Sequence, residues 1–484
     1  MDPKIQKSKE FFLSGIKHFQ NEDFGNAEKE FLESFNLTPD RLSIINNLIQ
    51  IYIHNEDAIK LENLIKKIDE THIDTFEVQS GHAYLHFFKK KYVESFNILK
   101  KIKSRNIDEE KLLLSLEAKL FEEKNEFDNA KLIYEKITNI SENNAKSFYN
   151  YGLFLIRINK TEEALKMLNK TLEMKSKIKV NEILWNKSLC ELKLKNIDKG
   201  YKIYKPLSRT ENEKKFLKLK ELTRIEDLIS NPKKVLIWGD QGYGDMIIFS
   251  RFVKYISKKY KIKINLLFPK KIKELFIDFD ENINLFENDE VQDLDIYDFQ
   301  IRLSCLPRVI NYKDFNDIEF YELNLKSESF NLQKKIPNIG LAWTGRTTYK
   351  HDNLRSIPLS YFEKLLAKNF QFYKLDKDIN ENDIDIFKKY SNIIDLGNKN
   401  FLDLANIIKQ LDLVISCDTS IIHLAGILNV KSYLMLNYNS YWTWFDDVKK
   451  TMWYPAVEII KQNNKNDWNN EFGKLERSIV QLYS

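Results

Sequence analysis

A recurring pair of small residues in the first 210 positions limits most strongly how this chain can fold. The two members of each pair stand twelve positions apart, as in Gly15 and Ala27, Ala83 and Ser95, Ala118 and Ala130, and Gly152 and Ala164. From the third pair to the fourth, both members advance by 34 residues. Because only small side chains let two helix backbones cross closely, the pattern predicts repeated pairs of antiparallel helices.

A period near 34 with small residues at two fixed positions is typical of tetratricopeptide (TPR) repeats, which stack into a solenoid. The first unit also carries Phe31, and Pro39 ends its second helix. A last, degenerate unit covers residues 181–208, with Gly200 at the second small position and Tyr204 four residues later. We therefore expect about six repeats and assign residues 1–212 to an all-α, TPR-like region.

Composition excludes several classes of function. The net charge is only +5, from 76 basic and 71 acidic residues, so we expect no nucleic-acid partner. No apolar stretch is long enough for a membrane span and no apolar segment follows the N-terminus, so we expect a protein without a transmembrane segment or secretory signal. The three cysteines, Cys190, Cys305 and Cys417, lie far apart, which favours a reducing cytoplasm and predicts no metal site.

The pattern of apolar residues in the sequence changes near residue 233. Short apolar runs that read as buried strands now alternate with helical stretches, at 235–238, 264–268, 339–343, 370–375, 413–416 and 432–436. Such alternation predicts βαβ units and parallel sheets. We expect two Rossmann-like α/β domains, at 233–333 and 336–484.

The first strand leads into a glycine-rich turn that contains Gly242 and Gly244 and ends at Asp245, where a helix begins. Glycines let a backbone turn tightly and approach a ligand, and the helix start offers free N–H groups. The spacing differs from that of a dinucleotide-binding fingerprint. Asp245 is either a helix-capping carboxylate or a general base that faces a cleft.

Two further loops follow strands at the edge where α/β sheets bind ligands. The loop 343–356 combines hydroxyl and cationic groups that suit a pyrophosphate, although a solvated polar loop has the same composition. Its candidate residues are Thr344, Gly345, Arg346, Lys350 and Arg355. The segment 416–426 brings hydroxyls and N–H groups to a helix start that could hold phosphate, with an imidazole one turn later that is either structural or phosphate-facing. Its candidate residues are Asp418, Thr419, Ser420 and His423.

A fourth segment, 437–444, is rich in aromatic residues and follows the strand 432–436. Trp442 and Trp444 either stack on a base or sugar, or pack in the core or between domains.

The order of these motifs resembles the TPR-containing relatives of the bacterial ADP-heptose:lipopolysaccharide heptosyltransferases. The matching segments are 235–245, Ser304-Cys305-Leu306-Pro307, 340–345 with 355–359, 412–426 and Trp453-Tyr454-Pro455. They run in order through residues 233–470. The resemblance implies a GT-B fold, in which two Rossmann-like domains face each other across a cleft, with the acceptor on the first and the nucleotide sugar on the second.

The resemblance also implies roles for single residues. It makes Asp245 the catalytic base, and it assigns contacts with the donor diphosphate to Asp418, Thr419, Ser420, His423, Thr344, Gly345 and Arg355. It implies inverting sugar transfer without a metal or other cofactor, in which protein dipoles and charges stabilise the leaving diphosphate. Two positions depart from the family: Asp376 stands where relatives often have Gln, and Thr443 where they often have Arg. Asp376 could bond a ribose, or the site could be altered.

Two hypotheses about function follow. In the first, the chain is a glycosyltransferase that uses a nucleotide sugar, and the concave face of the repeats presents a glycan or protein acceptor. In the second, it is a non-catalytic TPR scaffold whose GT-B part has degenerated into a sugar-nucleotide sensor. The departures at Asp376 and Thr443 favour the second, whereas the intact Asp245 and 418–423 segments favour the first.

Overall fold

The computed structural model describes most of the chain and divides it into two compact units. The described residues are 2–68, 70–141, 144–175, 177–207, 211–230, 233–287, 290, 293–325, 330, 332, 335–345, 352, 355–445, 449–465 and 467–483. The units are Met1–Tyr151 and Gly152–Ser484. The predicted domain limits at 212, 233, 333 and 336 remain predictions.

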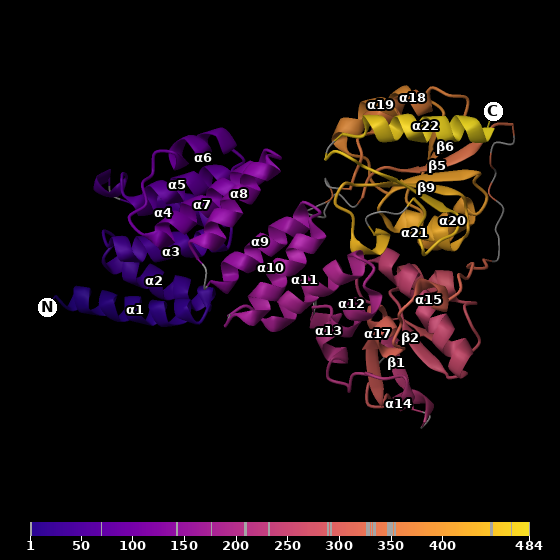
Figure 1. Ribbon diagram of the computed structural model, residues 1–484, viewed down its shortest axis with the longest axis horizontal. Coiled ribbons are helices and arrows are strands. Elements are labelled where there is room, and N and C mark those ends of the chain that lie inside the picture. The colour runs from indigo at the N-terminus through magenta and orange to yellow at the C-terminus, as the bar shows by residue number, and fades with distance from the viewer. Residues whose placement is uncertain are drawn as a thin grey trace. The chain divides into compact units, whose positions relative to one another are not determined.

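The first unit consists of paired helices (Figure 1). These are α1 (Pro3–Gln20), α2 (Phe24–Leu37), α3 (Leu42–His54), α4 (Ala58–Ile65), α5 (Phe76–Phe88), α6 (Tyr92–Leu99), α7 (Ile107–Glu123) and α8 (Phe127–Asn139). Helix α9 (Ala145–Arg157) contains the limit between the units, and the second unit continues with α10 (Thr161–Glu173), α11 (Val180–Lys193) and α12 (Ile197–Ile203). In the described part of the chain, α1 to α12 thus form six consecutive pairs, which confirms the predicted all-α repeats.

The small residues lie where helices cross, as their spacing predicted. Ala27 and Ala164 have no exposed surface. A Cβ atom added to Gly15 would lie 2.6 Å from the Phe31 ring, and one at Gly152 would lie 3.3 Å from Leu168. A larger side chain at these positions would push the paired helices apart.

The turns inside the helix pairs share a feature that the sequence analysis missed. One non-glycine residue in each has a left-handed backbone, with φ between 53° and 63°, namely Glu22, Glu56, Lys90, Asn125, Asn159 and Lys195. These residues recur at intervals of 34 to 36 positions, so the backbone conformation of the turn repeats with the helices.

The second unit contains two parallel sheets of the same strand order. The first has the order β3-β2-β1-β4, from β1 (Val235–Trp238), β2 (Ile264–Leu267), β3 (Ile283–Phe286) and β4 (Phe299–Arg302). The second has the order β10-β9-β8-β5-β6-β7, from β5 (Asn338–Ala342), β6 (Gln371–Lys374), β7 (Ile393–Asp395), β8 (Leu413–Cys417), β9 (Ser432–Leu436) and β10 (Val457–Lys461). When its strands are numbered from β5 and read from the β7 edge, the second sheet has the order 3-2-1-4-5-6, which is the Rossmann order. The first sheet has the first four strands of that order, 3-2-1-4. This confirms the two predicted α/β parts.

Helices cover both faces of the second sheet (Figure 1). On one side lie α18 (Glu363–Leu366), α19 (Ile384–Lys389) and α22 (Asn469–Tyr483), and on the other lie α20 (Phe401–Ile408) and α21 (Ser420–Ile427). Around the first sheet lie α13 (Glu211–Phe216), α14 (Glu226–Ile229), α15 (Tyr243–Tyr260), α16 (Lys270–Lys273) and α17 (Leu306–Val309).

One hydrophobic core joins the two α/β parts. It includes Phe249 and Val253 of α15 together with Ile408 of α20 and Leu424 of α21. Because α15 follows β1 and α21 follows β8, their packing brings the ligand-binding edges of the two sheets together. This is the arrangement that the GT-B resemblance implies.

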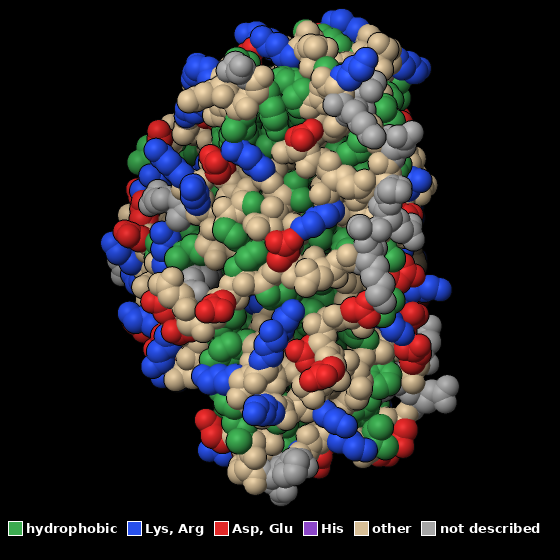
Figure 2. All heavy atoms as spheres, turned by 90° about the vertical axis from the view of Figure 1, so that its right-hand side faces the viewer, with side chains coloured by type: hydrophobic (Ala, Val, Ile, Leu, Met, Phe, Trp, Pro, Cys, Tyr) green, Lys and Arg blue, Asp and Glu red, His purple; other side chains and the backbone are tan. Residues whose placement is uncertain are grey.

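The face of the molecule in Figure 2 is mixed in charge. Lys and Arg are interspersed with Asp and Glu on the face shown in Figure 2, and neither sign forms a continuous patch there. None of the helices formed by the described residues is both long enough and apolar enough to cross a membrane.

Candidate functional site

The predicted loops meet at the points where the strand order of each sheet reverses. In the first sheet this point lies between β1 and β4, and in the second between β5 and β8. Polar loops leave the carboxyl ends of β1, β5 and β8, the positions where doubly wound sheets bind ligands. The ends of β1 and β4 are joined by Ser304, whose hydroxyl donates to Asp240 Oδ2 over 2.6 Å.

The glycine turn of the first part contacts the helix start of the second. A Cβ atom at Gly244 would lie 2.4 Å from His423 Cδ2 and 2.9 Å from its Nε2, so only a glycine fits at this contact. A Cβ atom at Gly242 would instead lie 3.3 Å from Asp245 Oδ2. Gly242 therefore lies against the carboxylate of Asp245, whereas Gly244 lies against His423. Residues about 180 positions apart thus face one another directly.

Asp245 lies at the third position of α15, beside this contact. Its Oδ2 accepts the N–H of Gly242 over 3.0 Å, and the side chain is half-buried. The carboxylate therefore caps the helix, which is the first of the two interpretations given for it. It also lies close enough to Tyr454 to raise the pKa of that phenol, although burial is the larger cause of the raised pKa. The role of Asp245 as a base stays a prediction.

The start of α21 lies on the other side of this contact. Thr419 is its N-cap, with Oγ1 accepting the N–H of Ile421 over 3.4 Å, and Ser420 is its first residue. Asp418 accepts a hydrogen bond from Trp444 Nε1 over 2.8 Å. Burial raises the pKa of Asp418, against the opposing effects of this bond and of Arg355. Arg355 is thus near enough to act on Asp418, so the loops after β5 and β8 converge.

His423 lies in the centre of the contact and is buried. Its ring stacks on Trp444, with centroids 4.8 Å apart and an interplanar angle of 19°. Its Nδ1 lies 3.2 Å from the hydroxyl of Tyr454. Burial lowers the pKa of His423 to about 3, so the imidazole is neutral at pH 7. It can supply a hydrogen bond to a ligand at that pH, but no positive charge.

The described residues of the loop after β5 are linked through the carboxylate of Asp352. Arg355 Nε donates to Asp352 Oδ1 over 2.9 Å, and Ser356 Oγ donates to Asp352 Oδ2 over 2.6 Å. The N–H of Gly345 donates to Ser356 Oγ over 2.9 Å. Thr344 is buried, and a Cβ at Gly345 would overlap Asp352. The other two predicted residues of this loop, Arg346 and Lys350, lie outside the described residues.

Asp376, one of the two departures from the family, binds the backbone at the start of this loop. Its Oδ2 accepts the N–H groups of Trp343 and Thr344 over 2.6 and 3.1 Å. Burial raises the pKa of Asp376 to about 8, and the two N–H bonds only partly oppose that effect. Asp376 is 5% exposed, so its carboxyl binds the backbone of the loop and presents little surface to a ribose.

The aromatic segment after β9 packs against protein. Trp442, at 2% exposure, contacts Tyr201 and Tyr204 of the last repeat and Phe249 of α15. For this residue the structure shows packing between parts of the unit, the second of the two predicted alternatives. Trp444 is buried as well, in its stack with His423. Thr443 is buried too, and its carbonyl accepts from Trp453 Nε1 over 2.7 Å.

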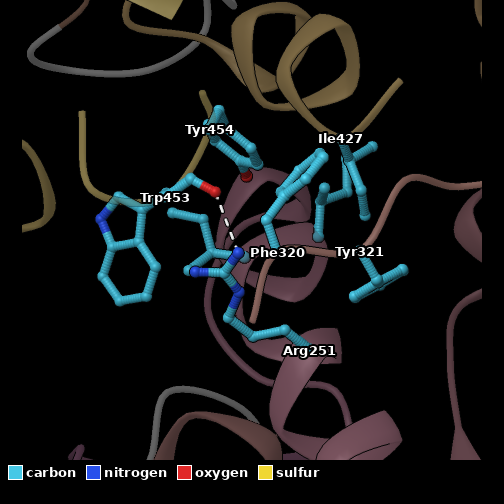
Figure 3. A pocket seen from close by; sticks show the side chains of 8 residues that line it. Arg251, Phe320, Tyr321, Ile427, Trp453 and Tyr454 are labelled. Carbon is cyan, nitrogen blue, oxygen red and sulfur yellow. Dashed lines mark hydrogen bonds between the residues drawn. The ribbon is translucent and has the colours of Figure 1, made fainter. Parts of the chain in front are cut away.

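The sequence analysis missed Arg251, which lies on α15 six residues beyond Asp245. Its guanidinium donates to the carbonyl of Trp453 over 2.9 Å. Figure 3 shows it directed at Trp453 and Tyr454, with Phe320, Tyr321 and Ile427 around it. Burial lowers the pKa of Arg251. A cation within an apolar helical run is the sequence feature that could have pointed to this contact between the two α/β parts.

The described residues contain no group of three or more His, Cys, Asp and Glu placed to hold a metal ion. The contacts of the candidate site set a guanidinium near the start of α21, with its N–H and hydroxyl groups, and a carboxylate on α15, the helix that packs against α21. The first two bind anions, and the third can accept a proton.

No family model matches this chain, and no curated protein matches it. Solved structures similar to it include glycosyltransferases and a tetratricopeptide repeat protein. The iron-containing dodecameric glycosyltransferase TibC from enterotoxigenic E. coli is 14% identical, with 54% of this chain and 78% of that one covered and a TM-score of 0.36. ADP-heptose LPS heptosyltransferase II of E. coli is 11% identical, with 52% and 100% covered and a TM-score of 0.36. A tetratricopeptide repeat protein from Parabacteroides merdae is 18% identical, with 37% and 69% covered and a TM-score of 0.32. The fold itself is established by the strand order and helix pairs of this chain.

Proposed function

We propose that this chain is a glycosyltransferase that moves a sugar from a nucleotide-activated donor to a hydroxyl group. The observation that supports the proposal is the contact of Gly244, the residue before Asp245, with His423 in the first turn of α21. A carboxylate on one helix and an anion-binding start on the helix that packs against it are what a transfer with a diphosphate leaving group needs.

In the proposed reaction the donor diphosphate binds the second α/β part. The N–H groups and hydroxyls of Thr419 and Ser420 and the guanidinium of Arg355 stabilise its negative charge. The acceptor hydroxyl enters from the first part, and Asp245 takes its proton. The hydroxyl oxygen then forms a bond to the anomeric carbon while the bond from that carbon to the diphosphate breaks, and the diphosphate leaves with the electron pair. Attack opposite to the leaving group inverts the anomeric carbon, and the scheme uses no metal.

The acceptor is a glycan or a protein in this proposal, and the repeats present it. Helical repeats form extended binding surfaces in solenoid proteins. A cytoplasmic location fits the use of nucleotide sugars and belongs to the same proposal.

The test compares the purified chain with Asp245→Asn on a panel of ADP-, GDP- and UDP-sugars, with release of nucleoside diphosphate as the readout. We expect the variant to lose about a hundredfold or more in turnover, because it has no base, while it keeps its nucleotide affinity. The matched control is Asp403→Asn, since Asp403 occupies the same third position in helix α20 and is likewise half-buried. Equal turnover in Asp245→Asn and the wild type would rule out the base.

The second candidate function is a scaffold that binds a sugar nucleotide without turning it over. The buried Asp376 and Thr443 favour it, because neither side chain is placed to face a phosphate. A scaffold would show a rise in melting temperature with a sugar nucleotide and no diphosphate release from the wild type or from Asp245→Asn.

A further inference from the structure

A buried lysine of the last repeat reaches into the second α/β part. Lys193 ends helix α11 and is 8% exposed. Its Nζ donates to Asn159 Oδ1 over 2.5 Å, to the carbonyl of Ser440 over 2.9 Å and to Asn439 Oδ1 over 3.2 Å. A buried ammonium held by oriented acceptors constrains them strongly, because each lost bond leaves a polar group without water. Lys193 therefore ties the repeats to the loop that follows β9.

That loop, residues 437–445, leads directly to the candidate donor site. Beyond Ser440, Trp442 packs on the last repeat, and Trp444 then donates to Asp418 and stacks on His423. The lysine-bound Asn439 and Trp444 are only five positions apart in the chain. A shift of the loop at Asn439 would thus move the group that holds Asp418.

The backbone of the loop is strained at its end. Phe445 has φ 53° and ψ 174°, a region that residues other than glycine rarely adopt, and it is buried. Such a conformation persists only where surrounding structure enforces it. Lys195, two residues after Lys193, places its ammonium 5.9 Å from the Phe445 ring centroid. The end of α11 and the turn after it therefore contact the loop near its start and at its strained end.

We propose that Lys193 is a positioning residue for the donor site, through which the last repeat holds Trp444, and with it Asp418 and His423, in the geometry that binds the nucleotide diphosphate. This inference rests on the proposed function for its ligand. The repeats are then part of the donor-binding apparatus as well as a surface for the acceptor.

The first test needs no ligand and uses hydrogen–deuterium exchange of the full chain. In Lys193→Met we expect faster amide exchange in residues 437–445 and also in 418–424, which Lys193 does not touch. The control is Lys199→Met, because Lys199 is an exposed lysine on the neighbouring helix α12. Faster exchange in 437–445 and α11 alone, with 418–424 unchanged, would mean that Lys193 only stabilises its own surroundings, and would overturn the proposal.

The second test measures the donor in steady state. We expect Lys193→Met to raise the donor KM by about tenfold, with a smaller change in kcat, because displaced binding groups weaken ground-state contacts. In a Trp444→Phe background, which lacks the bond to Asp418, the same substitution should change the KM less than twofold, since interacting sites are not additive. A full tenfold effect in both backgrounds would show that Lys193 does not act through Trp444.

The two tests separate this inference from the proposed function. If the wild type turns over no sugar nucleotide, the affinity for ADP replaces the KM and the same double-variant comparison applies. Faster exchange in 418–424 without any turnover would contradict the transferase and keep the positioning role. Sugar-nucleotide turnover by the wild type, together with unchanged exchange in 418–424 of Lys193→Met, would support the transferase and contradict the positioning role.

Discussion

At the scale of single residues, the candidate site depends on a glycine that has no room for a side chain. We predict that Gly244→Ala destabilises the second unit and lowers any donor turnover at least tenfold, because its Cβ would overlap the His423 ring and displace α15. Thermal unfolding and diphosphate release measure the two effects. Gly25→Ala, in helix α2, is the matched control: no atom lies within 4 Å of its added Cβ, so it should raise stability. Similar melting temperatures for the two variants would contradict the close contact.

A second prediction at this scale concerns Asp376. Its pKa is raised by burial from 3.8 to about 8, so the folded chain binds the proton more tightly than the unfolded chain. The contribution of this group to stability is therefore complete below about pH 4 and is lost as the pH rises towards 8. Asp376→Asn cannot ionise, and its amide oxygen can still accept from Trp343 and Thr344. We expect its melting temperature to fall less than that of the wild type between pH 5 and 8.

The control for this pH dependence is Asp385→Asn, at an exposed position on α19. Its melting curve should follow the wild-type pH dependence. Parallel curves for the wild type and Asp376→Asn would show that Asp376 does not take up a proton in this range.

Residue types and their order predicted the glycine turn and the helix start of the candidate site but not the contacts between them. A glycine turn or a helix start is visible as a local pattern, so Gly244, Asp245 and Thr419 could be found directly. Lys193 could not, because a lysine at the end of a polar helix is usually solvated, and its burial comes from a loop 246 positions away.

At the scale of elements, the sequence located the inner strands and missed the outer ones. Each of the six predicted runs overlaps one of the inner strands, which are β1, β2, β5, β6, β8 and β9. The four strands that were missed, β3, β4, β7 and β10, are the edges of the two sheets. Edge strands mix polar with apolar residues, as in Phe299-Gln300-Ile301-Arg302, so their pattern does not separate them from loops.

The left-handed turns of the repeats support a prediction at the same scale. An L-residue in this conformation costs about 1–2 kcal/mol, so Glu22→Gly should raise the free energy of unfolding of the first unit by up to about 1 kcal/mol. Asn21→Gly is the control, because Asn21 has φ −88° and gains nothing from glycine. It should lower stability by about 0.5–1 kcal/mol. Urea titration followed by circular dichroism measures both, and a loss of stability in Glu22→Gly would contradict the turn geometry.

At the scale of the whole molecule, the limit between the compact units falls at Tyr151 and Gly152, inside the repeat region. Helices α10 to α12 thus belong with the α/β parts, although their sequence reads as TPR. The repeat period shows where helices pair and says nothing about which neighbour they pack on. That choice depends on surfaces such as Tyr201 and Tyr204, which contact Trp442.

Truncation tests this division. A fragment of residues 145–484 keeps α9 to α12, and we expect it to be monodisperse, to unfold cooperatively and to gain melting temperature with the same sugar nucleotide as the full chain. A fragment of residues 211–484 keeps the two α/β parts together with α13 and α14 and removes the last repeats. It lacks Lys193, Tyr201 and Tyr204, so it exposes Trp442 and frees the acceptors at Asn439 and Ser440. Since large exposed apolar patches promote association, this shorter fragment should aggregate in size-exclusion chromatography or melt at a much lower temperature. Equal melting temperatures for two monodisperse fragments would mean that the last repeats contribute nothing to the fold of the α/β parts, because their removal would then cost no stability.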